Sequence, residues 1–139
     1  MSTRQVDLEL VEKMSTSALE AYNNSYCPYS KYKVGAAILT KDGTIFNGCN
    51  IENCTYTLTL HAEQTAIGNA ITKGQRVFQA LFVMSKDGQA TPCGICRQML
   101  YEHAETIPIY TIDPQGQIVH HFFLNDLLPH AFGPHNLKC

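Results

Sequence analysis

The chain has 139 residues, of which 45% are hydrophobic and 16% are charged. This balance describes one soluble globular domain, residues 1–139, with enough apolar side chains to build a core without disulfides. No stretch approaches the roughly 18 apolar residues of a membrane helix, and the N-terminus lacks a signal-peptide core. The net charge of −2, with ten scattered basic residues, argues against long nucleic acids and favours a small neutral substrate. We therefore expect a cytoplasmic protein that binds no membrane.

The spacing of apolar residues predicts elements in the order α-β-β-α-β-α-β-β-α. A helical stripe runs from about Val6 to Asn23, and this helix should end before Pro28. The other expected elements are strands at 34–39 and 44–49 with a turn at 41–43, a loop over 50–60, a helix over 61–73, a strand over 79–85, a helix over 93–103, strands over 107–112 and 118–122, and a short helix over 124–128. This order predicts an α/β fold with helices on the faces of a five-stranded mixed sheet.

Six cysteines in a chain without a secretion signal do not indicate a disulfide framework. Cys93 and Cys96 form a Cys-x-x-Cys motif, which in a cytosolic protein indicates metal binding or redox chemistry. The other four have no ligand-like spacing, and we expect them to be free thiols: Cys27, Cys49, Cys54 and Cys139. Of these, Cys49 and Cys54 are expected to be the buried ones.

Two short motifs, His61-Ala62-Glu63 and Pro92-Cys93-Gly94-Ile95-Cys96, carry most of the chemical information. They supply three zinc ligands, His61, Cys93 and Cys96, and one carboxylate that is not needed as a ligand. A structural zinc site closes with four protein ligands, whereas a catalytic site keeps one position open. The open position is expected to take water, with Glu63 placed to move its protons. The combination is also an established signature of zinc-dependent deaminases.

The two motifs impose a geometric condition on the fold. Cys93 and Cys96 start one predicted helix and His61 starts another, so the ligands converge only if the two helices begin side by side. His61 and Glu63 would diverge along a regular helix, so the metal must lie near the axis beyond the first turn. Arg97, next to Cys96, is expected to donate to the thiolates.

The motifs lie within a longer resemblance to the cytidine deaminases of pyrimidine salvage, from about Tyr26 to Phe132. The strings that carry it are Pro28-Tyr29-Ser30-Lys31-Tyr32-Lys33-Val34-Gly35-Ala36-Ala37, Asn50-Ile51-Glu52-Asn53, Pro92-Cys93-Gly94-Ile95-Cys96-Arg97-Gln98 and Leu127-Leu128-Pro129 followed by Ala131-Phe132. The resemblance implies a three-layer α-β-α cytidine deaminase-like fold. It also implies zinc-dependent hydrolysis of cytidine and deoxycytidine to uridine and deoxyuridine plus ammonia.

The resemblance further implies roles for individual residues. His61, Cys93 and Cys96 would hold Zn²⁺, and Glu63 would shuttle protons. The implied substrate-binding residues are Asn50 and Glu52 at the ribose 3′-hydroxyl, Tyr32 beside the base, Ala62, and Phe132 in the pocket of a neighbouring subunit. Short chains of this family are homotetramers with shared active sites, and we expect the same here.

Two departures from the family pattern concern the site. Short members usually carry Cys-Ala-Glu-Arg, whereas this chain has His61-Ala62-Glu63-Gln64. Zinc with two thiolates and a neutral imidazole is formally neutral, so Gln64 can stand beside the metal site where an arginine would offset a third thiolate. Tyr32 replaces the usual phenylalanine and adds a hydroxyl that needs a partner.

Three other functions fit the sequence less well. A polynucleotide deaminase would need a basic channel and stacking aromatics, and this chain has no Trp and no basic run. A deaminase of a nucleoside antibiotic shares the zinc motifs but lacks the Asn-Ile-Glu-Asn string. A non-enzymatic domain in which zinc only stabilises the fold would not explain the presence of Glu63 or the open coordination position.

Overall fold

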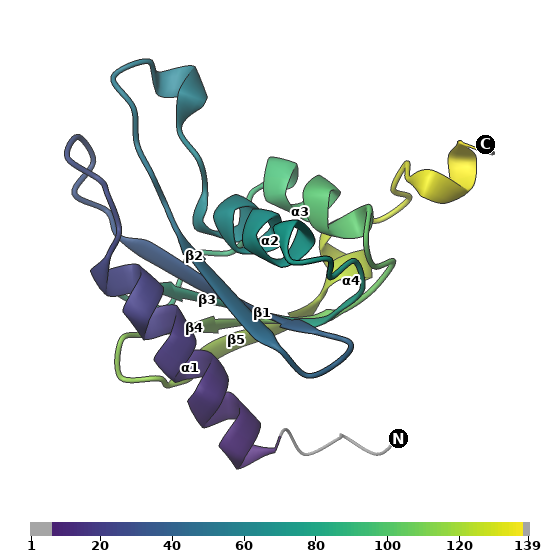
Figure 1. Ribbon diagram of the computed structural model, residues 1–139, viewed down its shortest axis with the longest axis horizontal. Helices are drawn as coiled ribbons and strands as arrows, with labels where there is room; N and C mark the ends of the chain where they lie inside the picture. The colour runs from purple at the N-terminus through teal and green to yellow at the C-terminus, as the bar shows by residue number, and fades with distance from the viewer. Residues whose placement is uncertain (1–6, 138–139) are drawn as a thin grey trace.

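The computed structural model describes residues 7–137, and its element order is the predicted one (Figure 1). The helices are α1 Leu8–Asn23, α2 Ala62–Thr72, α3 Gly94–Tyr101 and α4 Leu124–Leu127, and the strands are β1 Val34–Thr40, β2 Ile45–Cys49, β3 Phe78–Ser85, β4 Pro108–Ile112 and β5 Ile118–Phe123. The strands form one sheet in the order β2-β1-β3-β4-β5. Only β3 and β4 pair in parallel, so the expected five-stranded mixed sheet is confirmed.

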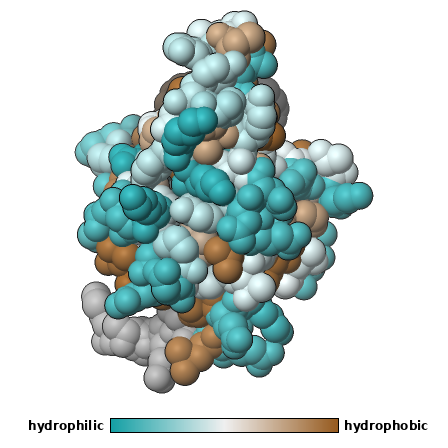
Figure 2. Space-filling model, turned by 90° about the vertical axis from the view of Figure 1, so that its left-hand side faces the viewer, coloured by the Kyte–Doolittle hydropathy of each residue, from teal (hydrophilic) through white to brown (hydrophobic). Residues whose placement is uncertain are grey.

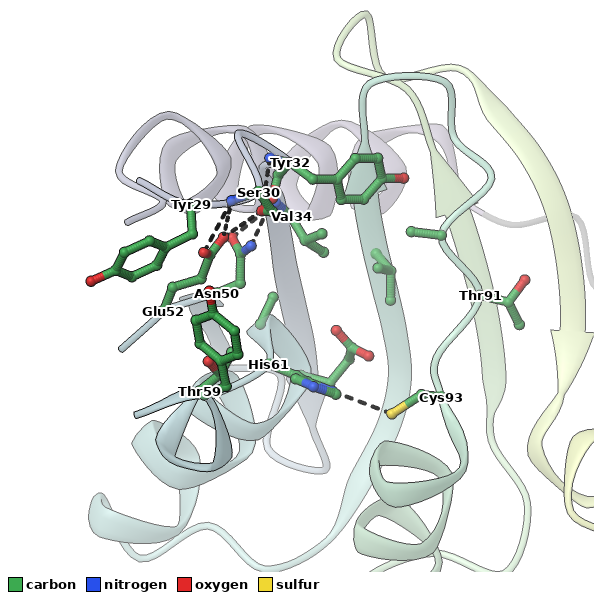
Figure 3. Close-up of a pocket in the computed structure, with 15 residues that line it drawn as sticks. Tyr29, Ser30, Tyr32, Val34, Asn50, Glu52, Thr59, His61, Thr91 and Cys93 are labelled. Carbon is green, nitrogen blue, oxygen red and sulfur yellow. Dashed lines mark hydrogen bonds between the residues drawn. The ribbon is translucent and has the colours of Figure 1, made fainter. Parts of the chain in front are cut away.

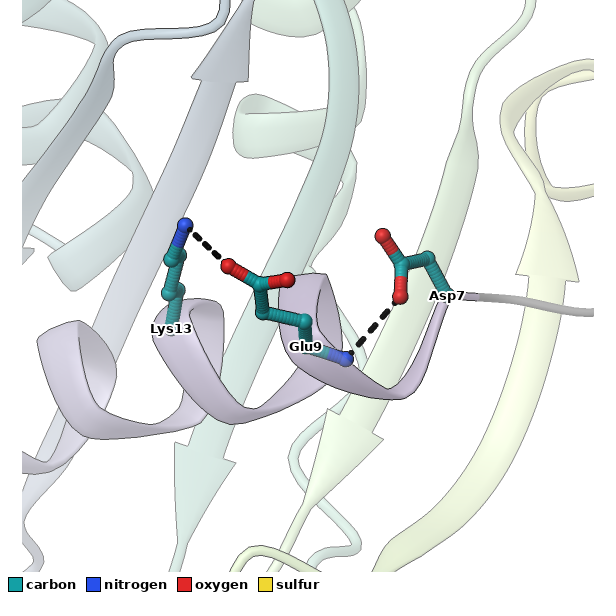
Figure 4. A network of polar contacts seen from close by, with 3 residues as sticks. All are labelled: Asp7, Glu9 and Lys13. Atoms are coloured by element: carbon teal, nitrogen blue, oxygen red, sulfur yellow. Dashed lines mark hydrogen bonds and ion pairs between the residues drawn. The ribbon is translucent and has the colours of Figure 1, made fainter.

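Helix α1 covers one face of the sheet (Figure 1). The Asp7 carboxylate caps its first turn by accepting a hydrogen bond from the Glu9 backbone N–H at 3.1 Å, and Glu9 pairs with Lys13 at 2.8 Å (Figure 4). On the opposite side of the helix, Met14 and Ala18 are fully buried against β1 and β3. The start of the predicted helix at Val6 lies outside the described residues.

Helices α2, α3 and α4 cover the other face, where a second apolar cluster forms. The buried face of α2 carries small residues, Ala62, Ala66 and Ala70, which let the helix lie close to the sheet. Gly48 of β2 is part of this close approach, because a Cβ there would lie 2.2 Å from the Ala66 backbone nitrogen. The position of the α2 N-terminus over the sheet therefore depends on small residues on both elements.

Two connecting segments lie next to each other at one edge of the sheet. Residues 24–33 join α1 to β1, and residues 50–61 join β2 to α2. Tyr26 and Ile51 bridge them as a single ladder pair. The second segment contains a one-turn 3₁₀ helix, η1 Tyr56–Leu58, where the sequence predicted only a loop. It projects from the body of the molecule, with polar and apolar side chains mixed on its surface (Figures 1 and 2).

The cysteines depart from expectation in their burial. Cys27, Cys49 and Cys54 are free thiols as predicted, but Cys54 is exposed and Cys49 only half-buried, so the expectation that these two are buried was wrong. Cys54 lies on the projecting segment, whereas Cys27 is buried at the base of the 24–33 segment. Cys139 lies outside the described residues. Within residues 7–137, no helix combines the length and apolar character needed to cross a membrane.

Candidate active site

A pocket of about 640 Å³ opens where the two connecting segments meet the N-terminal ends of α2 and α3 (Figure 3). Its inner wall is built by the first residues of α2, by Val83 of β3 and by Cys93. Its outer wall is built by residues of the 24–33 and 50–61 segments. The two segments of the outer wall are far apart in the sequence, and the second of them leads directly into α2 of the inner wall.

The three expected metal ligands converge at the inner wall. His61 is the N-cap of α2 and Cys93 is the N-cap of α3, so the two helices begin side by side as the motif geometry required. The Nδ1 atom of His61 lies 3.2 Å from the Cys93 Sγ and 3.3 Å from the Cys96 Sγ, and all three donor atoms lie within 4.8 Å of one another. This cluster of one nitrogen and two sulfurs could hold a metal ion.

The donor set fits zinc. Zinc bonds of about 2.3 Å to sulfur and 2.0–2.1 Å to nitrogen place neighbouring ligand atoms of a tetrahedral site about 3.6 Å apart. The distances from the His61 Nδ1 to the two sulfurs are a few tenths of an ångström shorter, a small adjustment for side chains. The ligands also stand at two helix N-termini, whose positive dipole ends favour thiolates. Three ligands leave one tetrahedral position open.

Without a bound cation, the inner wall favours the protonated forms of its acidic groups. Glu63 and Cys96 are both buried. Burial raises the pKa of the Glu63 carboxyl, against hydrogen bonds from its own backbone N–H and from the Cys96 thiol. Burial also raises the pKa of the Cys96 thiol far above its usual range, and the neighbouring Glu63 and Cys93 add to the effect. A divalent metal reverses this preference, because it binds the thiolate and releases the proton.

Gln64 and Arg97 hold the ligand-bearing backbone. The Gln64 side-chain oxygen accepts a hydrogen bond from the His61 backbone N–H at 2.7 Å, which fixes the start of α2. The Arg97 guanidinium donates to the carbonyls of Pro92 at 2.7 Å and Leu127 at 2.9 Å. The expectation that Arg97 donates to the thiolates is therefore not met, because the carbonyl just before Cys93 takes its Nε–H. Arg97 instead fixes the peptide that leads into Cys93.

At the outer wall, Asn50 is held by three neighbours. Its side-chain oxygen accepts hydrogen bonds from the Val34 backbone N–H at 3.0 Å and from the Ser25 hydroxyl, and its amide nitrogen donates to the Tyr32 carbonyl at 2.8 Å. One amide N–H of Asn50 remains for a ligand. The orientation of this amide is therefore set by the protein before any ligand binds.

Glu52 lies next to Asn50 at the pocket rim (Figure 3). Its carboxylate accepts hydrogen bonds from the Ser30 hydroxyl and from the Ser30 backbone N–H, the latter at 3.2–3.3 Å. These bonds, led by the hydroxyl, lower the pKa of the Glu52 carboxyl. The structure thus presents an ionised acceptor beside the free N–H of Asn50.

The remaining predicted substrate-binding residues differ in where they lie. Ala62 and Tyr32 line the pocket, and Tyr32 is 44% exposed, so its hydroxyl can be hydrated. Its ring extends toward the Thr91 side, whereas Tyr29 points away on the Glu52 side (Figure 3). Phe132 is not part of this chain's own pocket and is 61% exposed.

Sequence reasoning assigned no role to Ser30 or Thr91, although both line the pocket. Each stood inside or beside a recognised string, Ser30 after Pro28-Tyr29 and Thr91 before Pro92. A serine 22 residues from its carboxylate partner gives no periodic signal. Only the meeting of the two segments reveals the contact.

Comparisons with known proteins agree with this geometry. Residues 8–111 match the family model described as cytidine and deoxycytidylate deaminase zinc-binding region. A cytidine deaminase of Sporosarcina psychrophila is 43% identical over 130 residues, covering 92% of this chain and 95% of that protein.

Two crystal structures have the same fold. The cytidine deaminase of Burkholderia pseudomallei aligns with a TM-score of 0.80 at 39% identity, covering 87% of this chain and 98% of that one. The cytidine deaminase of Mycobacterium tuberculosis aligns with a TM-score of 0.77 at 38% identity, covering 88% and 96%. On these matches and on its zinc-type ligand cluster, the chain belongs to the cytidine and deoxycytidylate deaminase family.

Proposed function

We propose that this protein is a zinc-dependent hydrolase that converts cytidine and deoxycytidine to uridine and deoxyuridine, with release of ammonia. The observation that carries the proposal is the buried Glu63 carboxyl, which interacts with the Cys96 thiol of the three-ligand cluster. A structural zinc site would need a fourth ligand and no buried base. The same pairing at the end of a pocket supports hydrolysis of a bound ring.

In this proposal His61, Cys93 and Cys96 hold zinc, which when bound supplies an acidified water as the nucleophile. Glu63 accepts a proton from that water and delivers it to N3 of the base, so that C4 becomes open to attack. Glu63 then takes the second proton and transfers it to the amino group, which leaves as ammonia. A carboxyl group can both accept and donate a proton, which suits a residue that carries protons between these sites.

Asn50 and Glu52 would bind the sugar. The one free amide N–H of Asn50 is a donor, and the ionised Glu52 is an acceptor. A hydroxyl group can accept from the first and donate to the second, so the pair suits one hydroxyl of a ribose. The 3′-hydroxyl is common to cytidine and deoxycytidine, which supports use of both nucleosides.

The charge of the pocket favours a nucleoside over a nucleotide. Among the lining residues that the structure describes, none is Lys or Arg, while Glu52 and Glu63 are both present. Recognition of a 5′-phosphate ordinarily uses Arg, Lys or a cluster of backbone N–H groups. We therefore propose that deoxycytidylate, which the family name includes, is a poor substrate of this chain.

The test is the ultraviolet absorbance of cytidine, deoxycytidine and deoxycytidylate on mixing with zinc-loaded protein, with ammonia measured in parallel. We expect the nucleosides to lose absorbance and to release one ammonia each, with at least tenfold lower kcat/KM for the nucleotide. Faster turnover of the nucleotide would overturn the nucleoside assignment. No turnover of any of the three, with zinc bound, would overturn the enzyme assignment.

We also propose a single-domain homotetramer with shared active sites, located in the cytoplasm. Exposed Phe132 and the exposed apolar side chains Tyr56 and Leu58 on the projecting segment support burial between subunits. The free thiols among the described residues suit a reducing compartment. Light scattering coupled to size exclusion should give four chain masses, and a monomeric active enzyme would contradict the shared-site proposal.

A further inference from the structure

One hydroxyl group at the outer wall, that of Ser30, contacts two residues with different proposed tasks. Its oxygen accepts a hydrogen bond from the Tyr32 backbone N–H at 3.0 Å, and its proton is donated to the Glu52 carboxylate. The Ser30 backbone N–H donates to the same carboxylate. Ser30 therefore donates to the Glu52 carboxylate through both its hydroxyl and its backbone N–H.

We propose that Ser30 is the positioning residue of the ribose subsite: it orients the Glu52 carboxylate and ties its position to that of Tyr32. The inference rests on the proposed function, in which Glu52 binds the 3′-hydroxyl and Tyr32 lies beside the base. Ser30 itself needs no contact with substrate. It acts by restricting Glu52 to one orientation before the nucleoside enters.

The hydrogen-bond inventory explains why a hydroxyl is suited to this position. Because the Ser30 oxygen already accepts from the Tyr32 N–H, its proton is directed away from that group and toward Glu52. Glu52 can only accept while it is ionised, so each donor from Ser30 favours the charged form. An alanine would keep the backbone donor and lose the hydroxyl, leaving the carboxylate less tightly oriented.

The local backbone supports a built arrangement rather than a chance contact. Lys31, between Ser30 and Tyr32, has φ of 59°, a left-handed conformation that is uncommon for a residue with a side chain. The turn is closed by the Lys31 N–H, which donates to the Cys27 carbonyl at 3.0 Å. This conformation turns the Tyr32 N–H back toward the Ser30 hydroxyl. Glu52 is in turn anchored through its own backbone N–H, which donates to the Tyr26 carbonyl at 2.8 Å.

The competing interpretation is that Ser30 only stabilises the turn. A serine hydroxyl that accepts from the N–H two residues later is a common turn motif. In that case loss of the hydroxyl would weaken binding of all nucleosides alike, or would lower the stability of the fold without changing the preference among nucleosides. A positioning role instead predicts a loss confined to ligands that carry the 3′-hydroxyl. The two interpretations are therefore separable by the choice of nucleoside.

The experiment compares Ser30→Ala, Ser30→Thr and Glu52→Gln with the wild-type enzyme. KM and kcat are measured for cytidine and deoxycytidine, and 2′,3′-dideoxycytidine is titrated as a competitive inhibitor. We expect Ser30→Ala to raise KM for both substrates about tenfold, the size of a lost hydrogen bond to a charged group. We expect kcat and the inhibition constant of dideoxycytidine to stay within twofold. Ser30→Thr keeps the hydroxyl at an exposed position and should restore KM.

Thr106→Ala is the matched control, because it removes an exposed hydroxyl that donates to the Asn125 side chain outside the pocket. It should leave KM for cytidine and the inhibition constant of dideoxycytidine at wild-type values. Equal weakening of cytidine and dideoxycytidine by Ser30→Ala, an unchanged KM, or failure of Ser30→Thr to restore it would each overturn the positioning role.

Glu52→Gln separates this inference from the function on which it rests. If that variant weakens binding of cytidine but not of dideoxycytidine, the ribose assignment holds. A Ser30→Ala variant without effect would then overturn only the positioning role of Ser30. If Glu52→Gln changes the binding of cytidine and of dideoxycytidine to the same extent, the ribose assignment itself is wrong. A wild-type enzyme that turns over no cytidine overturns both.

Discussion

The inner and outer walls of the pocket are built in opposite ways. The inner wall consists of helix N-termini packed on the sheet, and its key groups, Glu63 and Cys96, are buried. The outer wall consists of two connecting segments, and its key groups, Asn50 and Glu52, are each held by several hydrogen bonds to neighbouring residues. Both walls are positioned before a ligand binds, but by different forces.

The difference suggests a division of labour. Metal chemistry tolerates little displacement of its ligands, and rigid elements supply the needed precision. Selection of a sugar needs only a donor and an acceptor at the right distance, which hydrogen-bonded loops can provide. Changes at the inner wall should therefore affect turnover and metal content. Changes at the outer wall should affect KM.

The largest expected effect tests the inner wall directly. Glu63→Gln removes the proton carrier but keeps nearly the same volume, so turnover of cytidine should fall by about 10²–10⁴-fold. Zinc content, measured by atomic absorption, should remain at the wild-type level because Glu63 is not a ligand. A variant that kept more than about a tenth of the activity would show that another group carries the proton.

Metal loss separates the two buried cysteines. Cys96→Ser should weaken zinc affinity by more than about 10²-fold, since loss of a ligand exceeds the 10–100-fold effect of residues that only orient one. Cys27→Ser changes another buried thiol, which lies outside the cluster, and should keep zinc. Competition with a chromogenic chelator measures both affinities. Similar zinc loss in the two variants would mean that burial, not ligation, explains the effect.

The rigidity of the inner wall can be weakened without touching a ligand. Gly48→Ala places a methyl 2.2 Å from the Ala66 backbone nitrogen, so α2 must move, at a cost of about 1–3 kcal/mol. Gly68→Ala, in α2 itself, has open space around the new methyl and should be neutral or stabilising. Urea unfolding of both variants gives the comparison. Equal free energies of unfolding for the two variants would contradict the view that close packing of α2 on the sheet positions the inner wall.

The smallest effect concerns the charge state of the outer wall. The Ser30 hydroxyl donates to ionised Glu52, so the pKa of this carboxyl lies below its usual value. The interaction therefore stabilises the folded protein at pH values above the unfolded-state pKa. This stabilisation is lost as the pH falls through the lowered folded-state pKa. Carbon-13 NMR titration should show this low value in the wild type and a higher one in Ser30→Ala. An unchanged titration would mean that the hydroxyl does not bind the carboxylate in solution.

The sequence by itself determined the element order and the inner wall. Apolar spacing and turn signals located the four α-helices and five strands of the described residues to within one or two residues at most ends. The ligand motifs were readable because His61 precedes one helix and Cys93 and Cys96 start another, so local spacing nearly fixes their geometry. One open condition was that the helices begin side by side, and the structure meets it.

The tertiary structure alone decided the outer wall and the environments of single residues. Ser30 reaches Glu52 across 22 residues of chain, and no local pattern encodes that contact. Arg97 was expected to donate to the thiolates but donates to two backbone carbonyls. Its place next to Cys96 in the sequence did not determine its hydrogen-bond partners. Burial of Cys27 rather than Cys54 likewise followed from which segment projects. Partners at long sequence separation depend on how the elements pack, and that information is not local to any motif.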